Sequence, residues 1–106
     1  MRTLIVLAFL LFSPASLGEV AKADITVLQV NTKWNKQHNI DLNNLIGCEV
    51  QFTWLEDQND NFKKQVQTVP IVVVYHNGRP VRQWSADLSF RLNLDLEEIQ
   101  RVIDKL

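Results

Sequence analysis

The alternation of apolar and polar positions predicts two strands in the first half of the chain. Residues 24–30 (DITVLQV) are mostly β-branched or apolar, with Gln29 as the polar interruption, which is typical of a strand covered on both faces. Residues 48–55 (CEVQFTWL) alternate between apolar and polar side chains, which indicates a strand with one buried face. The side chains that we expect on this face are Cys48, Val50, Phe52 and Trp54.

A helical period separates these two strands. From about residue 35 the spacing becomes i, i+4, i+7 and i+8, which is that of one helix face, and Gly47 stands where a helix would end. The sequence therefore predicts a helix of about three turns over residues 35–47. Its inward face would consist of His38, Leu42, Leu45 and Ile46.

The next elements are a short helix and a buried strand. Residues 56–61 are polar and turn-rich, and the apolar pair Phe62 and Val66 then predicts a short helix that ends near Gln67. The continuous apolar run over residues 71–75 predicts a central strand.

A hairpin follows this central strand. The dipeptide Asn77-Gly78 tolerates the positive φ angles of a tight turn, so residues 80–85 should return antiparallel. Pro80 lacks an amide donor, which places it at the start of a strand or on an edge strand.

The last segment predicts a closing helix. Asp95 and Glu98 provide an acidic pair at its start, and an apolar stripe follows. In the order β-α-β-α-β-β-α, the first two strands are joined by a crossover and are therefore parallel. We expect an α/β fold, a four-stranded mixed sheet flanked by helices, in one domain over residues 24–106. The stripe consists of Leu96, Ile99, Val102, Ile103 and Leu106.

This element order resembles that of the thioredoxin family. Residues 68–78 (TVPIVVVYHNG) look like the family's cis-proline strand and hairpin, and Trp34 stands where the Trp-Cys-Gly-Pro-Cys motif begins. The resemblance covers nearly all of residues 24–106. It implies a thioredoxin-like minimal fold without the strand and helix that come first in full-length thioredoxins, and a cis peptide bond before Pro70.

The residues that carry the family's chemistry are replaced. The resemblance places Asn35 at the nucleophilic cysteine, His38 at the resolving cysteine and Gln29 at the buried proton-carrying acid. Thiol exchange needs one thiolate to attack and a second thiol to release the mixed disulfide. We therefore expect a redox-inactive member of the family that is not an enzyme and has no catalytic residues and no cofactor.

Cys48 is the only cysteine, so no internal disulfide can form. Its position in a strand predicts a buried, inert side chain, and a reactive or partner-linked thiol is the alternative. A metal site built from His38 with His76 or Cys48 is not expected, because no pair has the short spacing of a zinc or copper site.

The first residues have the pattern of a secretory signal peptide. A basic start precedes an apolar run, residues 4–12, which is much shorter than the ~20 residues of a membrane span. Small residues fit cleavage after residue 18 or after residue 23. We expect residues 1–18 to be the signal peptide, with cleavage as late as residue 23, and an exported, periplasmic or extracellular product that has no membrane span after cleavage.

Composition narrows the class of partner. The 106 residues include 11 basic and 12 acidic side chains with no basic run, so nucleic acid is not expected. The hydrophobic fraction of 46% favours a globular domain.

These observations favour a binding or adaptor module that holds an extended segment of a protein or peptide partner. The resemblance implies that the amide and carbonyl of Val69, beside Pro70, face outward, where such a segment adds two hydrogen bonds. Trp34 would supply an apolar wall or cover the end of the sheet, with Asn35 and His38 beside it. Two other functions fit the same sequence: a thiol-disulfide redox protein that acts through its single cysteine, and a structural subunit of an envelope or secretion assembly.

Overall fold

The fold is organised around one four-stranded sheet, which the computed structural model describes within residues 24–106. The predicted signal peptide and its cleavage sites lie outside the described residues. The strand order across the sheet is β2-β1-β3-β4. The strands are β1 (Ile25–Asn31), β2 (Glu49–Trp54), β3 (Ile71–His76) and β4 (Arg79–Ser85).

The strands pair as the sequence predicts. β1 runs parallel to β2, with Val27 opposite Val50, and antiparallel to β3, with Val27 opposite Val74. β3 and β4 form an antiparallel hairpin whose turn places Asn77 at a φ of 53° and Gly78 at a φ of 80°. Both residues occupy the left-handed region that such a tight turn requires. The predicted hairpin and the predicted mixed sheet are therefore confirmed.

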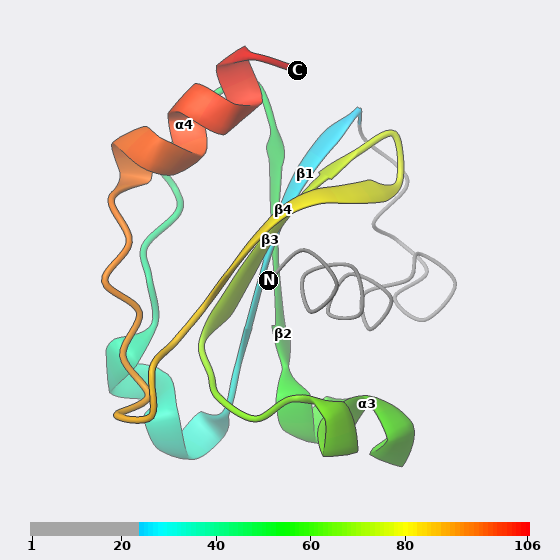
Figure 1. The fold of residues 1–106 in the computed structure, drawn as a ribbon, viewed down its shortest axis with the longest axis vertical. Helices are drawn as coiled ribbons and strands as arrows, with labels where there is room; N and C mark the ends of the chain where they lie inside the picture. Colours follow the sequence, from blue (N-terminus) through cyan, green and yellow to red (C-terminus); the bar gives the residue numbers. More distant parts are fainter. Residues whose placement is uncertain (1–23) are drawn as a thin grey trace.

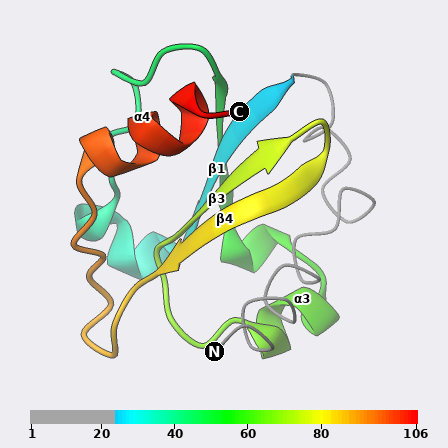
Figure 2. The ribbon, with the colours of Figure 1, turned by 45° about the horizontal axis from the view of Figure 1, so that its top comes forward.

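Helices cover both faces of the sheet, α3 (Asp60–Gln65) on one side and α4 (Leu96–Asp104) on the other (Figures 1 and 2). Because β1 and β3 give alternate side chains to the two faces, both central strands are buried on both sides. The core on the α3 face consists of Leu28, Val30, Phe62, Ile71, Val73 and Tyr75. The core on the α4 face consists of Val27, Leu42, Leu45, Val72, Val74, Ile99 and Ile103.

The start of α4 agrees only in part with the prediction. Asp95 is the N-cap, and its Oδ1 accepts a hydrogen bond from the Glu97 amide at 3.2 Å. Glu98 was expected to complete this cap. Instead, Glu98 Oε2 accepts hydrogen bonds from Trp84 Nε1 at 2.8 Å and from Arg82 Nη2 at 3.3 Å, so it ties α4 to β4.

The helix predicted over residues 35–47 is wrong. The structure has a short 3₁₀ helix, η2 (Lys33–His38), and residues 39–48 follow as an irregular segment. This segment is rich in asparagine and aspartate, whose side chains compete with helical hydrogen bonding. Asp41 Oδ1, for example, accepts a hydrogen bond from the Asn43 amide at 3.0 Å.

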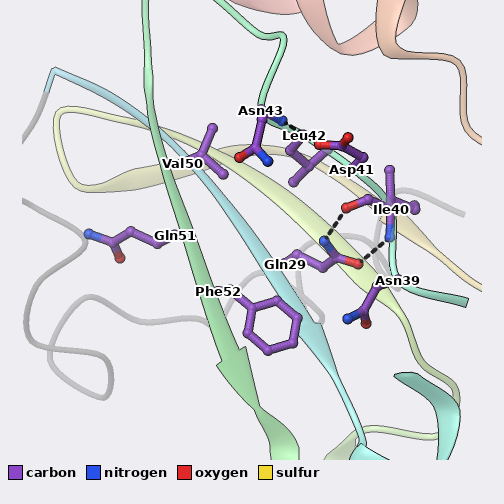
Figure 3. A pocket seen from close by; sticks show the side chains of 9 residues that line it. All are labelled: Gln29, Asn39, Ile40, Asp41, Leu42, Asn43, Val50, Gln51 and Phe52. Carbon is purple, nitrogen blue, oxygen red and sulfur yellow. Dashed lines mark hydrogen bonds between the residues drawn. The ribbon is translucent and has the colours of Figure 1, made fainter. Parts of the chain in front are cut away.

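Two glutamine side chains hold the irregular segment against the fold. Gln29 on β1 donates from Nε2 to the Ile40 carbonyl and accepts from the Ile40 amide at Oε1, both at 2.8 Å (Figure 3). Gln100 on α4 makes the same pair of bonds with Ile46, both at 3.0 Å. Each glutamine satisfies the amide and the carbonyl of one backbone residue, as a neighbouring strand would.

The missing helix leaves one face of β2 partly uncovered. Val50 is 36% exposed and Phe52 is 42% exposed, so the prediction that they lie on a buried face is wrong. The physical reason is that β2 is an edge strand whose α4-side neighbour is an irregular segment and not a helix. Trp54 is partly buried, and its ring meets that of Phe52 edge to face, with centroids 4.7 Å apart.

Candidate functional site

Trp34 stands on η2, directly after the C-terminal end of β1, and its side chain is 61% exposed. Its ring meets the ring of Phe90 edge to face, with a centroid distance of 5.0 Å and an interplanar angle of 78°. Phe90 comes from the segment between β4 and α4 and has a φ of 61°, which is uncommon for a bulky side chain. An exposed Trp34 ring packed against a partly buried Phe90 ring therefore marks this end of the sheet.

Glu56 fixes the start of η2. Its Oε2 accepts a hydrogen bond from the Lys33 amide at 2.9 Å, which satisfies one of the donors that a helix start leaves unpaired. This bond favours the charged carboxylate and lowers the pKa of Glu56 below its ordinary value of 4.5. Glu56 lies on η3 (Leu55–Asp57), which follows β2, so two neighbouring parallel strands position η2.

Asn35 is the centre of a buried hydrogen-bond network beneath Trp34, and only 1% of its surface is exposed. Its Nδ2 lies 3.1 Å from each of three acceptors: Asn31 Oδ1, the Val69 carbonyl and the Phe90 carbonyl. Because an amide nitrogen carries two hydrogens, at least one of them is shared. One side chain thus joins β1, the residue before Pro70 and the segment that carries Phe90.

His38 is attached to the same network. Its Nδ1 lies 2.7 Å from Asn35 Oδ1. An amide oxygen only accepts, so Nδ1 of His38 carries the hydrogen, and Nε2 of the neutral ring is an acceptor. Asn31 Nδ2 completes the arrangement by donating to the Asn35 carbonyl at 3.0 Å and to Asn39 Oδ1. Asn35 and His38, which the resemblance places at the two cysteines of the family motif, are therefore joined by a direct hydrogen bond.

Val69 and Pro70 lie beneath this surface, and the peptide bond between them is cis. Val69 is only 2% exposed, and its carbonyl accepts from Asn35 Nδ2. The expectation that this carbonyl faces outward is therefore wrong, because it accepts a hydrogen bond from the buried side-chain amide of Asn35. The Val69 amide forms no hydrogen bond with residues 24–106, so one backbone donor is left beside Pro70.

Cys48 and His76 are not part of this site. β1 and β2 are parallel, and Thr26 pairs with Glu49 while Asn31 pairs with Trp54, so Cys48 lies at the opposite end of the sheet from η2. His76 pairs with Ile25 and also lies at that opposite end. Within residues 24–106, no group of three or more His, Cys, Asp or Glu side chains could hold a metal ion.

The thiol of Cys48 has an environment of its own. Its side chain is partly buried at the margin of the core on the α4 face. Burial raises the pKa of the thiol above its ordinary value of 9.0, which disfavours the nucleophilic thiolate.

Three members of the network were not predicted from the sequence: Asn31, Asn39 and Phe90. Asn31, Asn35 and Asn39 recur every fourth residue, and this spacing, ending next to His38, is a signal that could have identified Asn31 and Asn39. Phe90 carries no such signal, because it reaches Trp34 from more than fifty residues away through an irregular segment.

Solved structures match the fold of this chain. No protein family model and no curated protein matches its sequence. A mutant thioredoxin from Halobacterium salinarum NRC-1 is similar with a TM-score of 0.62 and 14% identity, over 83% of this chain and 79% of that one. The chain has the thioredoxin fold. The oxidised thioredoxin from Plasmodium falciparum is similar with a TM-score of 0.54 and 10% identity, over 83% of this chain and 86% of that one.

The predicted thioredoxin-like fold is thus confirmed, with asparagine and histidine at the positions where the resemblance places the two cysteines. Asn35 and His38 lie at the end of β1 next to the residue before Pro70. Among residues 24–106, no helix is both long enough and apolar enough to cross a membrane.

Proposed function

We propose that this chain is an exported, redox-inactive binding or adaptor module that holds an extended segment of a partner protein. Trp34 and His38 would contact the segment, while Asn35, Val69 and Pro70 shape the surface beneath them. The observation that carries the proposal is the exposed Trp34 ring, held against Phe90 and supported from below by the Asn35 network.

The absence of redox activity follows from the chemistry of this surface. Neither Asn35 nor His38 can attack a disulfide or release a mixed disulfide. Cys48 lies at the other end of the sheet, its raised pKa disfavours the thiolate, and the chain has no second cysteine to release a mixed disulfide. In an insulin-reduction assay with a thiol donor, the protein should show no turnover above the buffer blank, and measurable turnover would refute this part of the proposal.

The polar groups around Trp34 suit an extended backbone. The Val69 amide is a donor without a partner among the described residues, but Val69 is only 2% exposed, so an incoming carbonyl has to reach a buried group in order to bind it. His38 Nε2 is an acceptor in the neutral ring and a donor when the ring is protonated. An indole provides a rigid apolar contact at little entropic cost, which is why tryptophan is enriched where proteins bind one another.

The expected affinity is low. One indole and two or three polar groups cover far less area than a standard protein interface of ~1,600 Å², and ordering an extended segment costs free energy. We therefore expect dissociation constants in the micromolar range or weaker.

Binding can be tested with a displayed library of unstructured peptides selected on the purified protein. Peptides from the selection would be synthesised, and their affinities measured for the parent, Trp34→Ala and Val81→Ala. Val81 is a matched control, because it is 40% exposed and lies on the edge strand β4, far from η2 in the strand order. Loss of tenfold or more with Trp34→Ala alone supports the proposal. Equal affinity of all three folded proteins would refute it.

Export is a separate part of the proposal and rests on the basic and apolar pattern of the first residues. Expression of the full chain followed by amino-terminal sequencing of the product outside the cytoplasm should give a start at residue 19 or residue 24. A product that stays in the cytoplasm with Met1 or Arg2 first would contradict it.

A further inference from the structure

A second candidate site lies between the edge strand β2 and the irregular segment, and it shares Asn39 with the network beneath Trp34. It is a pocket of about 170 Å³. Figure 3 shows Val50 and Phe52 of β2 on one side of it, Asn39 and Asn43 on the other, and Gln29 of β1 between them. The pocket exists because residues 39–43 form an irregular segment beside β2 and not a helix.

One wall of the pocket is aromatic. Phe52 is 42% exposed, although it is a large apolar side chain, and its ring is set by the edge-to-face contact with Trp54 at 4.7 Å. A ring fixed in this way offers a flat apolar surface whose orientation does not have to be ordered when a ligand binds.

The opposite wall offers unused hydrogen-bonding groups. Asn43 makes no side-chain hydrogen bond with the described residues, and only its backbone amide is bonded, to Asp41. Asn39 uses Oδ1 to accept from Asn31, which leaves its Nδ2 as a donor. Asp41 accepts one bond at Oδ1 and keeps its second carboxylate oxygen as an acceptor. The wall therefore presents both donors and acceptors.

Gln29, which lines the pocket between its two walls, has no free amide group for a ligand. Gln29 is only 4% exposed, and both ends of its amide are bonded to Ile40. Recognition would therefore come from the aromatic wall and the polar wall alone.

These features select a class of ligand. Among residues 24–106, Asp41 is the only charged residue that lines the pocket, so phosphate esters and other anions are disfavoured. The volume is well below the ~300–1,000 Å³ of pockets for drug-sized ligands, which limits the ligand to about one ring. A sugar ring offers a C–H face for the phenyl ring and hydroxyls that donate to carboxylate and accept from amide. We propose that this pocket, lined by Asn39, Asp41, Asn43 and Phe52, binds a single uncharged sugar ring.

The test is a titration of the purified protein, followed by ¹⁵N–¹H correlation spectra, with D-glucose, D-galactose and N-acetyl-D-glucosamine. At least one sugar should give saturable shifts of the amides over residues 39–43 and 50–52, with a millimolar dissociation constant because the site is open and small. Adenine and glycerol serve as a planar ring without hydroxyls and as hydroxyls without a ring. No saturable shift with any sugar, or equal shifts with adenine or glycerol, would overturn the proposal.

Variants locate the contact. Phe52→Ala and Asn43→Ala should each weaken sugar binding about fivefold or more, whereas Phe52→Tyr keeps the stacking surface and should stay within about twofold. Val81→Ala on the other edge strand should leave binding unchanged. If Phe52→Ala fails to fold, Asn43→Ala decides, because its side chain holds nothing in the described structure. If Asn43→Ala binds the sugar as tightly as the parent does, and Phe52→Ala does so too wherever it folds, the proposal is overturned. The result is independent of peptide binding, since Trp34→Ala should not change it.

Discussion

Gln29 and Ile40 form a two-bond pair in which the glutamine amide takes both the amide and the carbonyl of the isoleucine backbone, each at 2.8 Å. Gln29 stands where the family resemblance places a buried acid. A carboxylate cannot make this pair, because it has no hydrogen to donate to the Ile40 carbonyl. Gln29 therefore has a structural role in this chain, and it holds the segment that stands in place of the predicted helix.

Gln29→Glu should destabilise the fold by about 1–3 kcal/mol, because it removes a buried donor and brings a carboxylate towards the Ile40 carbonyl. Urea denaturation followed by circular dichroism would measure the change in the free energy of unfolding. Gln67→Glu is the control for the added charge, since Gln67 is exposed and makes no hydrogen bond with the described residues. If the two variants unfold at the same urea concentration, the Gln29–Ile40 hydrogen bonds contribute nothing to the free energy of unfolding.

The strands were predictable because their signals are local. The continuous apolar run that forms β3 and the Asn77-Gly78 turn each follow from a few adjacent residues, and the structure confirms them. The helix over residues 35–47 failed because periodicity reports only which positions are apolar. Leu42 and Leu45 are buried as that pattern requires, but glutamine side chains from β1 and α4 hold the backbone in another conformation.

The site was predictable only in part, for a similar reason. Trp34, Asn35 and His38 could be named because the resemblance lays them on the family's Trp-Cys-Gly-Pro-Cys motif, and the structure gathers them at one end of the sheet. What sequence patterns did not reveal is that Asn35 is buried and reaches Phe90, because that contact spans an irregular segment without periodicity.

Asn35→Ala should lower the free energy of unfolding by about 1–3 kcal/mol, because it leaves the buried Val69 carbonyl without the Asn35 donor and the His38 Nδ1 donor without its acceptor. Thermal or urea unfolding measures this loss. Asn61→Ala on α3 is the matched control, since the Asn61 side chain is exposed and makes no hydrogen bond with the described residues. A change no larger than that of the control would mean that the network is not needed for the fold.

Glu56 should make the stability of the protein dependent on pH in the acid range. Its pKa is lowered in the folded state by the bond from the Lys33 amide, so its contribution is present above the ordinary value of 4.5 and is lost as the pH falls through the folded pKa. Glu56→Gln should therefore lose less stability than the parent between about pH 5 and pH 3. Glu97→Gln, at an exposed side chain without a hydrogen bond to the described residues, should keep the parent's acid dependence. Parallel pH profiles for all three proteins would contradict this role.

Cys48 should react slowly with a thiol reagent. Burial raises the pKa of its thiol, so the thiolate fraction near pH 7 is smaller than that of a free cysteine. Absorbance after addition of an aromatic disulfide reagent would follow the reaction, and unfolding in urea should accelerate it. A native rate equal to the unfolded rate would favour the alternative of a reactive thiol.

The central claim is that the surface around Trp34 binds an extended peptide, and ¹⁵N–¹H correlation spectra with a selected peptide test it most directly. The resonances to follow are the Trp34 indole, the His38 ring and the Val69 amide, which has no hydrogen-bond partner among residues 24–106. The account predicts that the peptide shifts these signals saturably, while the Phe52 and Val81 amides stay unchanged. Saturable binding that leaves the Trp34 and Val69 signals where they were would contradict the account.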